Sequence, residues 1–327
     1  MKIDHKRRSL LGGIAMTGSL GVGAIAWAQD AWPSRPVRFI VPSSPGGGTD
    51  LYARLLAQAL TDAMRQQFVV ENRPGASGNI GAAAAAKATP DGYTFLVSAN
   101  PALTINPNLY STLPYDAERD FVPIVRALGP LLLVVHPSLK ARSLAEWIEL
   151  GRREPGKLSY GSAGVGSPTY LGVRMLEEKT GARFLHVPYK GVGPAYQDLL
   201  GGQIQFMFPD LASAFPHIRA GRILPIALER PIAILPGVPT IQSQGLPNFE
   251  APSGFALVAP SATPSAIVER IGREASAIHR SPEFVSKLET MGLVVLAETP
   301  AELAGALRKE RADYGDFIRR NSIIASD

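Results

Sequence analysis

The stretch VRFIVPSSPGGGTD, residues 37–50, passes from a short apolar run through a glycine-rich turn to a polar segment. Residues 37–41 predict a β-strand that ends at Pro42, because proline lacks the N–H that a central strand would need. The segment that follows carries leucines at 51, 55, 56 and 60 and Met64 on one helical face. This strand–turn–helix order is the repeating unit of an α/β protein.

The same order recurs along the chain and extends the α/β prediction to most of it. Further strands are predicted at residues 68–70, 93–97, 131–135, 184–187, 204–208 and 255–259. Further helices are predicted at residues 80–88, 143–150, 167–181, 264–279, 282–291 and 300–319. Residues 221–252 are rich in proline and weakly periodic, so we interpret them as an extended return segment.

Composition narrows the class of protein. A chain of 327 residues exceeds what one compact core usually holds, which favours two domains. The absence of cysteine excludes structural disulfides, thiolate metal sites and a cysteine nucleophile. The formal charge is +5, of which residues 1–28 carry +3, so the remainder lies near +2 and does not favour a nucleic-acid partner.

Residues 1–28 are predicted to be a signal peptide. They begin with a basic region ending at Arg8, continue through an apolar stretch at 10–26 and finish in Ala26-Trp27-Ala28. Small residues at positions −3 and −1 place cleavage after Ala28 and the mature protein in the periplasm. The pair Arg7-Arg8 also fits a twin-arginine signal, so both the Sec and the twin-arginine routes stay open. An uncleaved anchor is the weaker alternative, since glycines interrupt the apolar stretch.

Two glycine-rich turns each precede a predicted helix, at residues 46–49 and 161–167. Unpaired N–H groups and the helix dipole make such helix starts suitable for anions, and glycine lets a ligand approach the backbone. Two such starts facing each other would hold a small molecule with a carboxylate at either end. The alternative is that the glycines only permit tight strand-to-helix turns. Neither turn has the lysine of a phosphate-binding loop or the third glycine of a dinucleotide fingerprint.

Catalytic and metal-binding patterns are missing from the sequence. No Gly-x-Ser-x-Gly elbow occurs, and His136, His186, His217 and His279 have no metal-ligand spacing. Asp50, at a helix start, is interpreted as serving the helix dipole. We therefore expect no enzymatic activity, no metal ion and no cofactor.

Eight short motifs occur in an order that resembles the Bug family of periplasmic receptors, the solute-binding component of tripartite tricarboxylate transporters. They are WPSRP at 32–36, PGGGTD at 45–50, VENRPG at 70–75, GNIG at 78–81, PDGY at 90–93, VPYKG at 187–191, DLLGG at 198–202 and LVAP at 257–260. They span nearly the whole chain after residue 28.

This resemblance implies an α/β fold of two domains, the type II periplasmic binding or Venus-flytrap class, with a cleft between the domains. It implies capture of a small carboxylate (a di- or tricarboxylate, an acidic amino acid or an aromatic acid) and its delivery to a membrane permease. The ligand-binding residues that it implies are Ser44, Gly47, Gly48, Thr49, Ser98, Asn100, Ser162, Gly166, Ser167, Thr169, Tyr170, Tyr189 and Asp210.

The chain departs from the family pattern at several positions near the expected cleft. Val165 replaces a common asparagine, Tyr170 a common histidine, and Pro209-Asp210 a common Asp-Asn pair. Residues 228–231 and 253–255 also differ. These departures leave the ligand open. Asp210 either favours a ligand with an amine, because a carboxylate near a bound anion repels it, or lies away from the ligand.

We predict domain 1 at residues 29–128 plus 253–327 and domain 2 at 129–252, with two crossings that suit a hinge. A monomer is expected, because a receptor that closes must leave both domains free. Two alternatives remain. One is a periplasmic ligand-sensing subunit of a signalling system, which needs the same closing receptor. The other is a small-molecule enzyme on the same scaffold.

Overall fold

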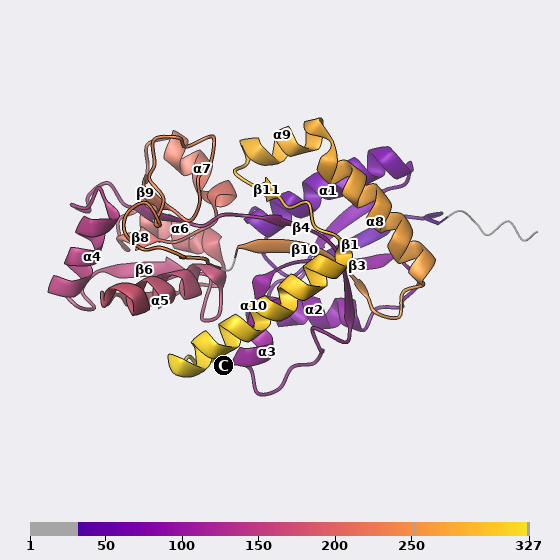
Figure 1. Cartoon of the computed structure of the whole chain (residues 1–327), viewed down its shortest axis with the longest axis horizontal. Helices are drawn as coiled ribbons and strands as arrows, with labels where there is room; N and C mark the ends of the chain where they lie inside the picture. The colour runs from indigo at the N-terminus through magenta and orange to yellow at the C-terminus, as the bar shows by residue number, and fades with distance from the viewer. Residues whose placement is uncertain (1–31, 252, 326–327) are drawn as a thin grey trace, which may run out of the picture. The chain divides into compact units, whose positions relative to one another are not determined.

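The computed structural model describes residues 32–251 and 253–325, and two mixed β-sheets organise them (Figure 1). In spatial order, the six-stranded sheet consists of β11 (Val294–Val295), β4 (Phe121–Leu128), β10 (Gly254–Pro260), β3 (Thr94–Ala99), β1 (Val37–Val41) and β2 (Phe68–Asn72). The five-stranded sheet consists of β7 (Leu185–Pro188), β6 (Ser159–Ser162), β8 (Phe206–Met207), β5 (Leu132–Val135) and β9 (Leu224–Leu228). The α/β prediction is confirmed.

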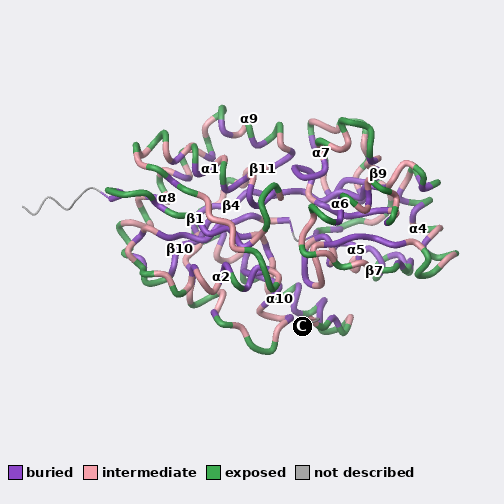
Figure 2. Tube along the Cα trace, turned by 180° about the vertical axis from the view of Figure 1, so that it is seen from behind, coloured by how far each residue is buried: buried purple, intermediate pink, exposed green. Residues whose placement is uncertain are grey.

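The first sheet combines a parallel part with antiparallel strands supplied by distant sequence. Strand β1 pairs in parallel with β2 and β3, whereas β10 pairs antiparallel with β3 and β4. Alternate residues of β1 serve opposite faces. Ile40 packs with Ala82 and Ala85, while Phe39 meets Phe68 edge-on at 5.4 Å between ring centroids. All residues of this strand except Arg38 are buried, and Figure 2 shows buried residues along most strands.

The second sheet is buried on both faces in the same way. Leu133 and Val135 of β5 join a cluster around Trp147 and Tyr160. The alternate residue Val134 joins a separate cluster on the other face. This period of two is what a strand covered on both sides requires.

Helices connect the strands and cover the sheets. They are α1 (Gly48–Met64), α2 (Asn79–Ala86), α3 (Asn106–Leu109), α4 (Leu144–Arg153), α5 (Pro168–Thr180), α6 (Val192–Leu200), α7 (Leu211–Arg219), α8 (Ser265–Arg280), α9 (Pro282–Thr290) and α10 (Pro300–Arg320), with a 3-10 turn η1 (Ala76–Gly78) and a π turn η2 (Pro101–Ile105). Three of the predicted helices begin with a side-chain N-cap. Ser143, Ser167 and Thr299 each accept a hydrogen bond from the backbone N–H three residues ahead.

The chain passes from the first sheet to the second between Leu128 and Leu132 and returns between Leu228 and Gly254. The two connections are hydrogen-bonded to each other. The Gly129 N–H donates to the Ser253 carbonyl at 2.6 Å, and the Leu131 N–H donates to a carboxylate oxygen of Glu229 at 3.0 Å. The exact domain boundaries stay a prediction.

The sequence-based prediction missed several elements. Strand β9 lies inside the segment predicted to be an extended return, and β4, α6 and α7 were not predicted. Pro225 in β9 and Pro216 inside α7 obscure the periodicity of those segments. Among the described residues, no helix is long and apolar enough to cross a membrane.

Candidate functional site: two helix starts and the residues around them

The glycine-rich turn before α1 is closed by a buried carboxylate from within the helix. Asp50 is 2% exposed and accepts hydrogen bonds from the Gly46 N–H at 2.9 Å and from Arg54 Nε at 3.0 Å. Asn72 donates to its other oxygen at 2.9 Å. Burial opposes ionisation, but these donors outweigh it and hold the pKa of Asp50 below its ordinary value. Asp50 therefore holds the turn in place through hydrogen bonds, and its predicted interaction with the helix dipole stays a prediction.

A second carboxylate, that of Asp210 at the start of α7, reaches the start of α1 from the part of the chain that forms the second sheet. Asp210 is the N-cap of α7, where it accepts from the Ser213 N–H and the Ser213 hydroxyl, both at 2.9 Å. Its Oδ1 atom also lies close to Gly48, the first residue of α1, where a Cβ atom would be only 2.6 Å away. The N-cap residue of α1 is Gly47, which has no side chain to cap the helix. Asp210 thus caps α7 and places its carboxyl group against the start of α1, and burial raises the pKa of that group.

This contact explains why residue 48 is glycine. A Cβ atom there would lie 2.6 Å from Asp210 Oδ1 and 2.8 Å from Phe255 Cζ. Both distances are shorter than any normal contact with a Cβ atom, so a side chain at position 48 would displace Asp210 or the Phe255 ring.

The turn before α5 is held by hydroxyl groups instead of carboxylates. The Ser167 hydroxyl donates to the Gly164 carbonyl at 2.6 Å and lies 2.9 Å from Thr169 Oγ1. Thr169 Oγ1 accepts from the Ala163 N–H at 3.0 Å, and Ser162 Oγ accepts from the Gly164 N–H at 3.0 Å. Ser162, Ser167 and Thr169 are all buried. The predicted residues of this turn therefore form one network.

Residues from segments that connect the strands of the first sheet pack against the turn before α5. Gly166 has φ +80°, and a Cβ atom on it would lie 2.3 Å from Leu109 of α3. Ser77 donates to the Val165 carbonyl at 3.4 Å. Beside the turn, the Tyr170 ring lies 4.7 Å from the His186 ring, and His186 Nε2 lies 2.6 Å from Ser162 Oγ. Burial lowers the pKa of His186 to about 4, so this imidazole is neutral at pH 7.

Tyr189 lies in the segment that brings the two turns together. Its hydroxyl donates to Asp198 at 2.6 Å, and burial together with that bond raises the pKa of Tyr189 to about 12. Two residues further on, Gly191 faces the Ser44 hydroxyl, and Val192 faces Gly47. Ser44, Gly47, Gly48 and Asp210 are therefore brought together, with the exposed Ser44 at the edge.

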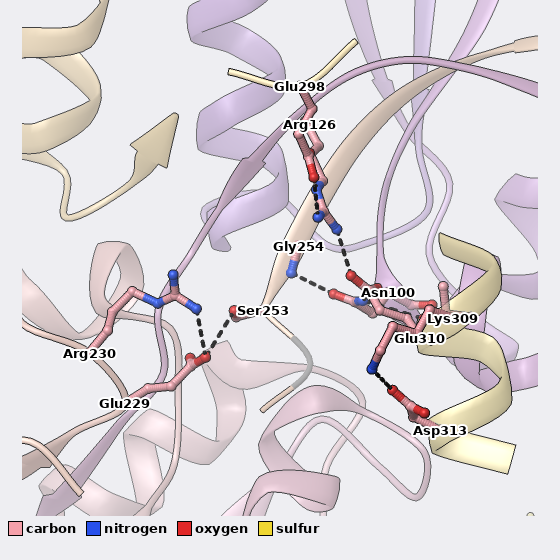
Figure 3. Close-up of polar contacts among 11 residues, drawn as sticks. Asn100, Arg126, Glu229, Arg230, Ser253, Gly254, Glu298, Lys309, Glu310 and Asp313 are labelled. Atoms are coloured by element: carbon pink, nitrogen blue, oxygen red, sulfur yellow. Dashed lines mark hydrogen bonds and ion pairs between the residues drawn. The ribbon is translucent and has the colours of Figure 1, made fainter. Parts of the chain in front are cut away.

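Asn100, just after β3, lies in a charged cluster with Arg126 and Glu310 (Figure 3), and Ser98 lines the same small cavity. Asn100 donates to Glu310 at 2.7 Å and accepts from the Gly254 N–H at 2.5 Å. Glu310 in turn accepts from Arg126 at 2.5 Å, and Arg126 also pairs with Glu298 through two bonds of 2.6 and 2.7 Å. The role of Asn100 in ligand binding stays a prediction, as does that of Ser98.

A groove of about 540 Å³ lies along α10 and α5. Its lining includes Arg126, Glu178, Lys309, Glu310 and Arg320, and it contains none of the predicted ligand-binding residues. We assign the candidate site to the helix starts instead, because the groove is lined by long charged side chains that pair with one another. Arg320, for example, pairs with Glu178 at 2.7 Å.

Three partners of the candidate residues were not predicted from the sequence, namely Asp198, His186 and Glu310. Asp198 belongs to one of the motifs, but nothing in the sequence links it to Tyr189. His186 was set aside as a lone histidine, and Glu310 sits 210 positions from Asn100. Among the described residues, no group of three or more histidine, aspartate or glutamate side chains is placed to hold a metal ion.

Comparison with solved structures defines the class of protein. The chain is similar to the periplasmic binding protein BugD, with 29% identity, a TM-score of 0.83 and coverage of 90% of this chain and 100% of that one. It is similar to R. palustris Rpa4515 with adipate, at 34% identity, TM-score 0.85 and coverage of 90% and 99%. It is also similar to MatC from Rhodopseudomonas palustris with bound malate, at 29% identity, TM-score 0.80 and coverage of 87% and 99%. The fold is that of a two-domain periplasmic solute-binding protein.

The family follows from the sequence itself. Residues 52–322 match the model of the tripartite tricarboxylate transporter family receptor, TctC. The chain belongs to this family, and the resemblance found from the eight motifs is confirmed. Members of the family are periplasmic solute-binding proteins and not enzymes.

Proposed function

We propose that this protein captures a small carboxylate in the periplasm and delivers it to the permease of a tripartite tricarboxylate transporter. The observation that carries the proposal is that each of the two glycine-rich helix starts contacts residues from segments that connect the strands of the other sheet. The start of α1 contacts Asp210 and Val192, and the start of α5 contacts Ser77 and Leu109. Relatives of the same fold with adipate and malate bound support the carboxylate class.

Helix starts suit this ligand for a physical reason. The first N–H groups of a helix have no partner within it, and the macrodipole places a partial positive charge there. A carboxylate at such a start gains on the order of 0.3–1 kcal/mol from the dipole, beyond its hydrogen bonds. The hydroxyls of Ser162, Ser167 and Thr169 offer further polar contacts around the start of α5, and closure of two domains around the ligand would remove it from water.

Export to the periplasm is part of the proposal. The predicted signal peptide and its cleavage after Ala28 lie outside the described residues. N-terminal sequencing of the mature protein tests the cleavage site, and export in strains that lack the twin-arginine translocase separates that route from Sec. In the periplasm, we propose that the receptor acts as a monomer.

The partner distinguishes transport from sensing. If the partner is a permease, deletion of the gene should abolish uptake of the ligand, and cross-linking should recover an integral membrane permease. Recovery of a membrane kinase, with uptake intact, would favour the ligand-sensing alternative. Turnover of the bound compound would favour an enzyme.

Binding is tested by thermal-shift measurements on residues 29–327 against a panel of carboxylates, amino acids and sugars. A ligand at 100 times its Kd should stabilise the folded state by about 2.7 kcal/mol. We expect a saturable rise in Tm with a carboxylate and none with sugars. A rise with sugars alone would refute the proposal.

A matched pair of variants locates the site. Ser167 and Ser281 are both N-caps followed by proline, and each accepts from the N–H three residues ahead. Ser167→Ala and Ser281→Ala should both lose about 1 kcal/mol of stability, because each removes a cap. Only Ser167→Ala should weaken the carboxylate-induced shift. Equal shifts in both variants would place the ligand elsewhere.

A further inference from the structure

The two helix starts differ in the charge that the protein itself places on them. At the turn before α1, the Gly46 N–H already donates to Asp50, and the carboxyl group of Asp210 lies directly against Gly48. At the turn before α5, the corresponding partners are the hydroxyls of Ser162, Ser167 and Thr169. One start therefore holds two carboxylates, and the other holds only neutral groups.

The two carboxylates at α1 are not equivalent. Asp50 forms an ion pair with Arg54 at 3.0 Å, which offsets its charge. Within residues 32–251 and 253–325, no lysine or arginine forms an ion pair with Asp210. The nearest charged residues on the connection toward the first sheet, Glu229 and Arg230, pair with each other. The donors to Asp210 are backbone and hydroxyl groups, which hold a carboxylate in place without adding a countercharge.

We infer that Asp210 is a specificity-determining residue that restricts the ligand to a single carboxylate, bound at the start of α5. This inference rests on the proposed function and deepens it. Asp210 places a carboxyl group of the protein against the start of α1, so a second ligand carboxylate would meet a like charge there when Asp210 is ionised. Burial raises the pKa of this group, so the binding measurements are made at pH 8, which favours the ionised form. The opposite end of the ligand is neutral or carries an amine.

The size of the effect follows from Coulomb's law. Two unit charges about 8 Å apart, at the effective dielectric constant of about 20 that suits sites near a protein surface, weaken binding on the order of 30-fold. An ammonium group at the same place is attracted instead. The protein should therefore discriminate between ligands that differ only in the group farthest from the bound carboxylate.

The experiment measures Kd by calorimetry for three sets of matched ligands. They are butyrate, succinate and 4-aminobutyrate; hexanoate, adipate and 6-aminohexanoate; and benzoate with terephthalate. In the set that binds, we expect the dicarboxylate to bind at least about tenfold more weakly than its partners. In Asp210→Asn, which keeps a good N-cap for α7 and removes the charge, the ratio of the two Kd values should fall to within about threefold.

Control variants separate charge at this position from charge in general. Asp62→Asn removes an exposed carboxylate from the far end of α1 and should leave the Kd ratio as in the wild type. Asp210→Ser supplies a second neutral cap if Asp210→Asn does not fold. A wild type that binds the dicarboxylate more tightly, or a ratio that Asp210→Asn leaves unchanged, overturns the inference alone. If no carboxylate of any set binds the wild type, the proposed function fails, and the inference falls with it.

Discussion

The charged cluster around Arg126 allows a prediction whose magnitude follows from its geometry. The guanidinium group is 8% exposed and lies between Glu298 and Glu310, to which it makes three hydrogen bonds of 2.5–2.7 Å. Replacing Arg126 by methionine fills a similar volume but leaves two largely buried carboxylates without their cation. Loss of one partner from such a buried pair costs about 3–5 kcal/mol. The corresponding fall in Tm is about 6–10 °C for a chain of this size.

The assay is thermal and urea unfolding at pH 7, with a surface ion pair as control. Arg35 pairs with Asp91 at 2.8 Å, but its side chain is 60% exposed, so Arg35→Met should cost less than about 1 kcal/mol. Adding Glu310→Gln to Arg126→Met should recover part of the loss, because one unpaired charge is removed. Equal costs for Arg126→Met and Arg35→Met, or no recovery in the double variant, would refute the reasoning.

Two further predictions concern stability. Gly48→Ala should cost about 1–3 kcal/mol of stability and weaken ligand binding, since its Cβ would lie 2.6 Å from Asp210 Oδ1 and 2.8 Å from Phe255 Cζ. Gly305→Ala, in a helix with no atom within 4 Å of the new Cβ, should instead stabilise the protein by up to about 1 kcal/mol. If urea unfolding gives stability changes of the same sign for both variants, this reasoning is contradicted. Burial lowers the pKa of His279 to about 4, so the folded state resists protonation and stability is lost as the pH falls from 6.5 toward 4. His279→Gln should remove about 2–3 kcal/mol of the loss in unfolding free energy between pH 6.5 and 4.5, and an unchanged loss would count against this assignment.

Local patterns carried much of the fold prediction. The continuous apolar run at residues 131–135 and the serine–proline pair at 167–168 identify a strand and a helix start correctly, because both signals act within one element. Strand β9 was missed for the opposite reason. Its pairing with β5 is made with residues almost 100 positions away, and Pro225 masks its local pattern.

The candidate site also has a part that local sequence predicts and a part that it does not. The glycine-rich turns before α1 and α5, and the Ser167 cap of α5, were predictable because each turn and its helix are adjacent in sequence. Asn100 shows the limit. The family resemblance implies that it contacts the ligand, which stays a prediction, and the sequence gives no sign that Glu310 and Gly254 reach its side chain from 210 and 154 positions away.

The sequence by itself determined the α/β class, the two helix starts and membership of the receptor family, since each depends on residues close together or on motifs in a fixed order. Only the tertiary structure decided what meets those helix starts. The carboxyl group of Asp210 comes to Gly48 from the start of α7, which lies beside the second sheet and more than 160 positions along the chain. Long-range pairing of this kind leaves no local signal, because it depends on how the two sheets are placed and not on the propensity of either segment.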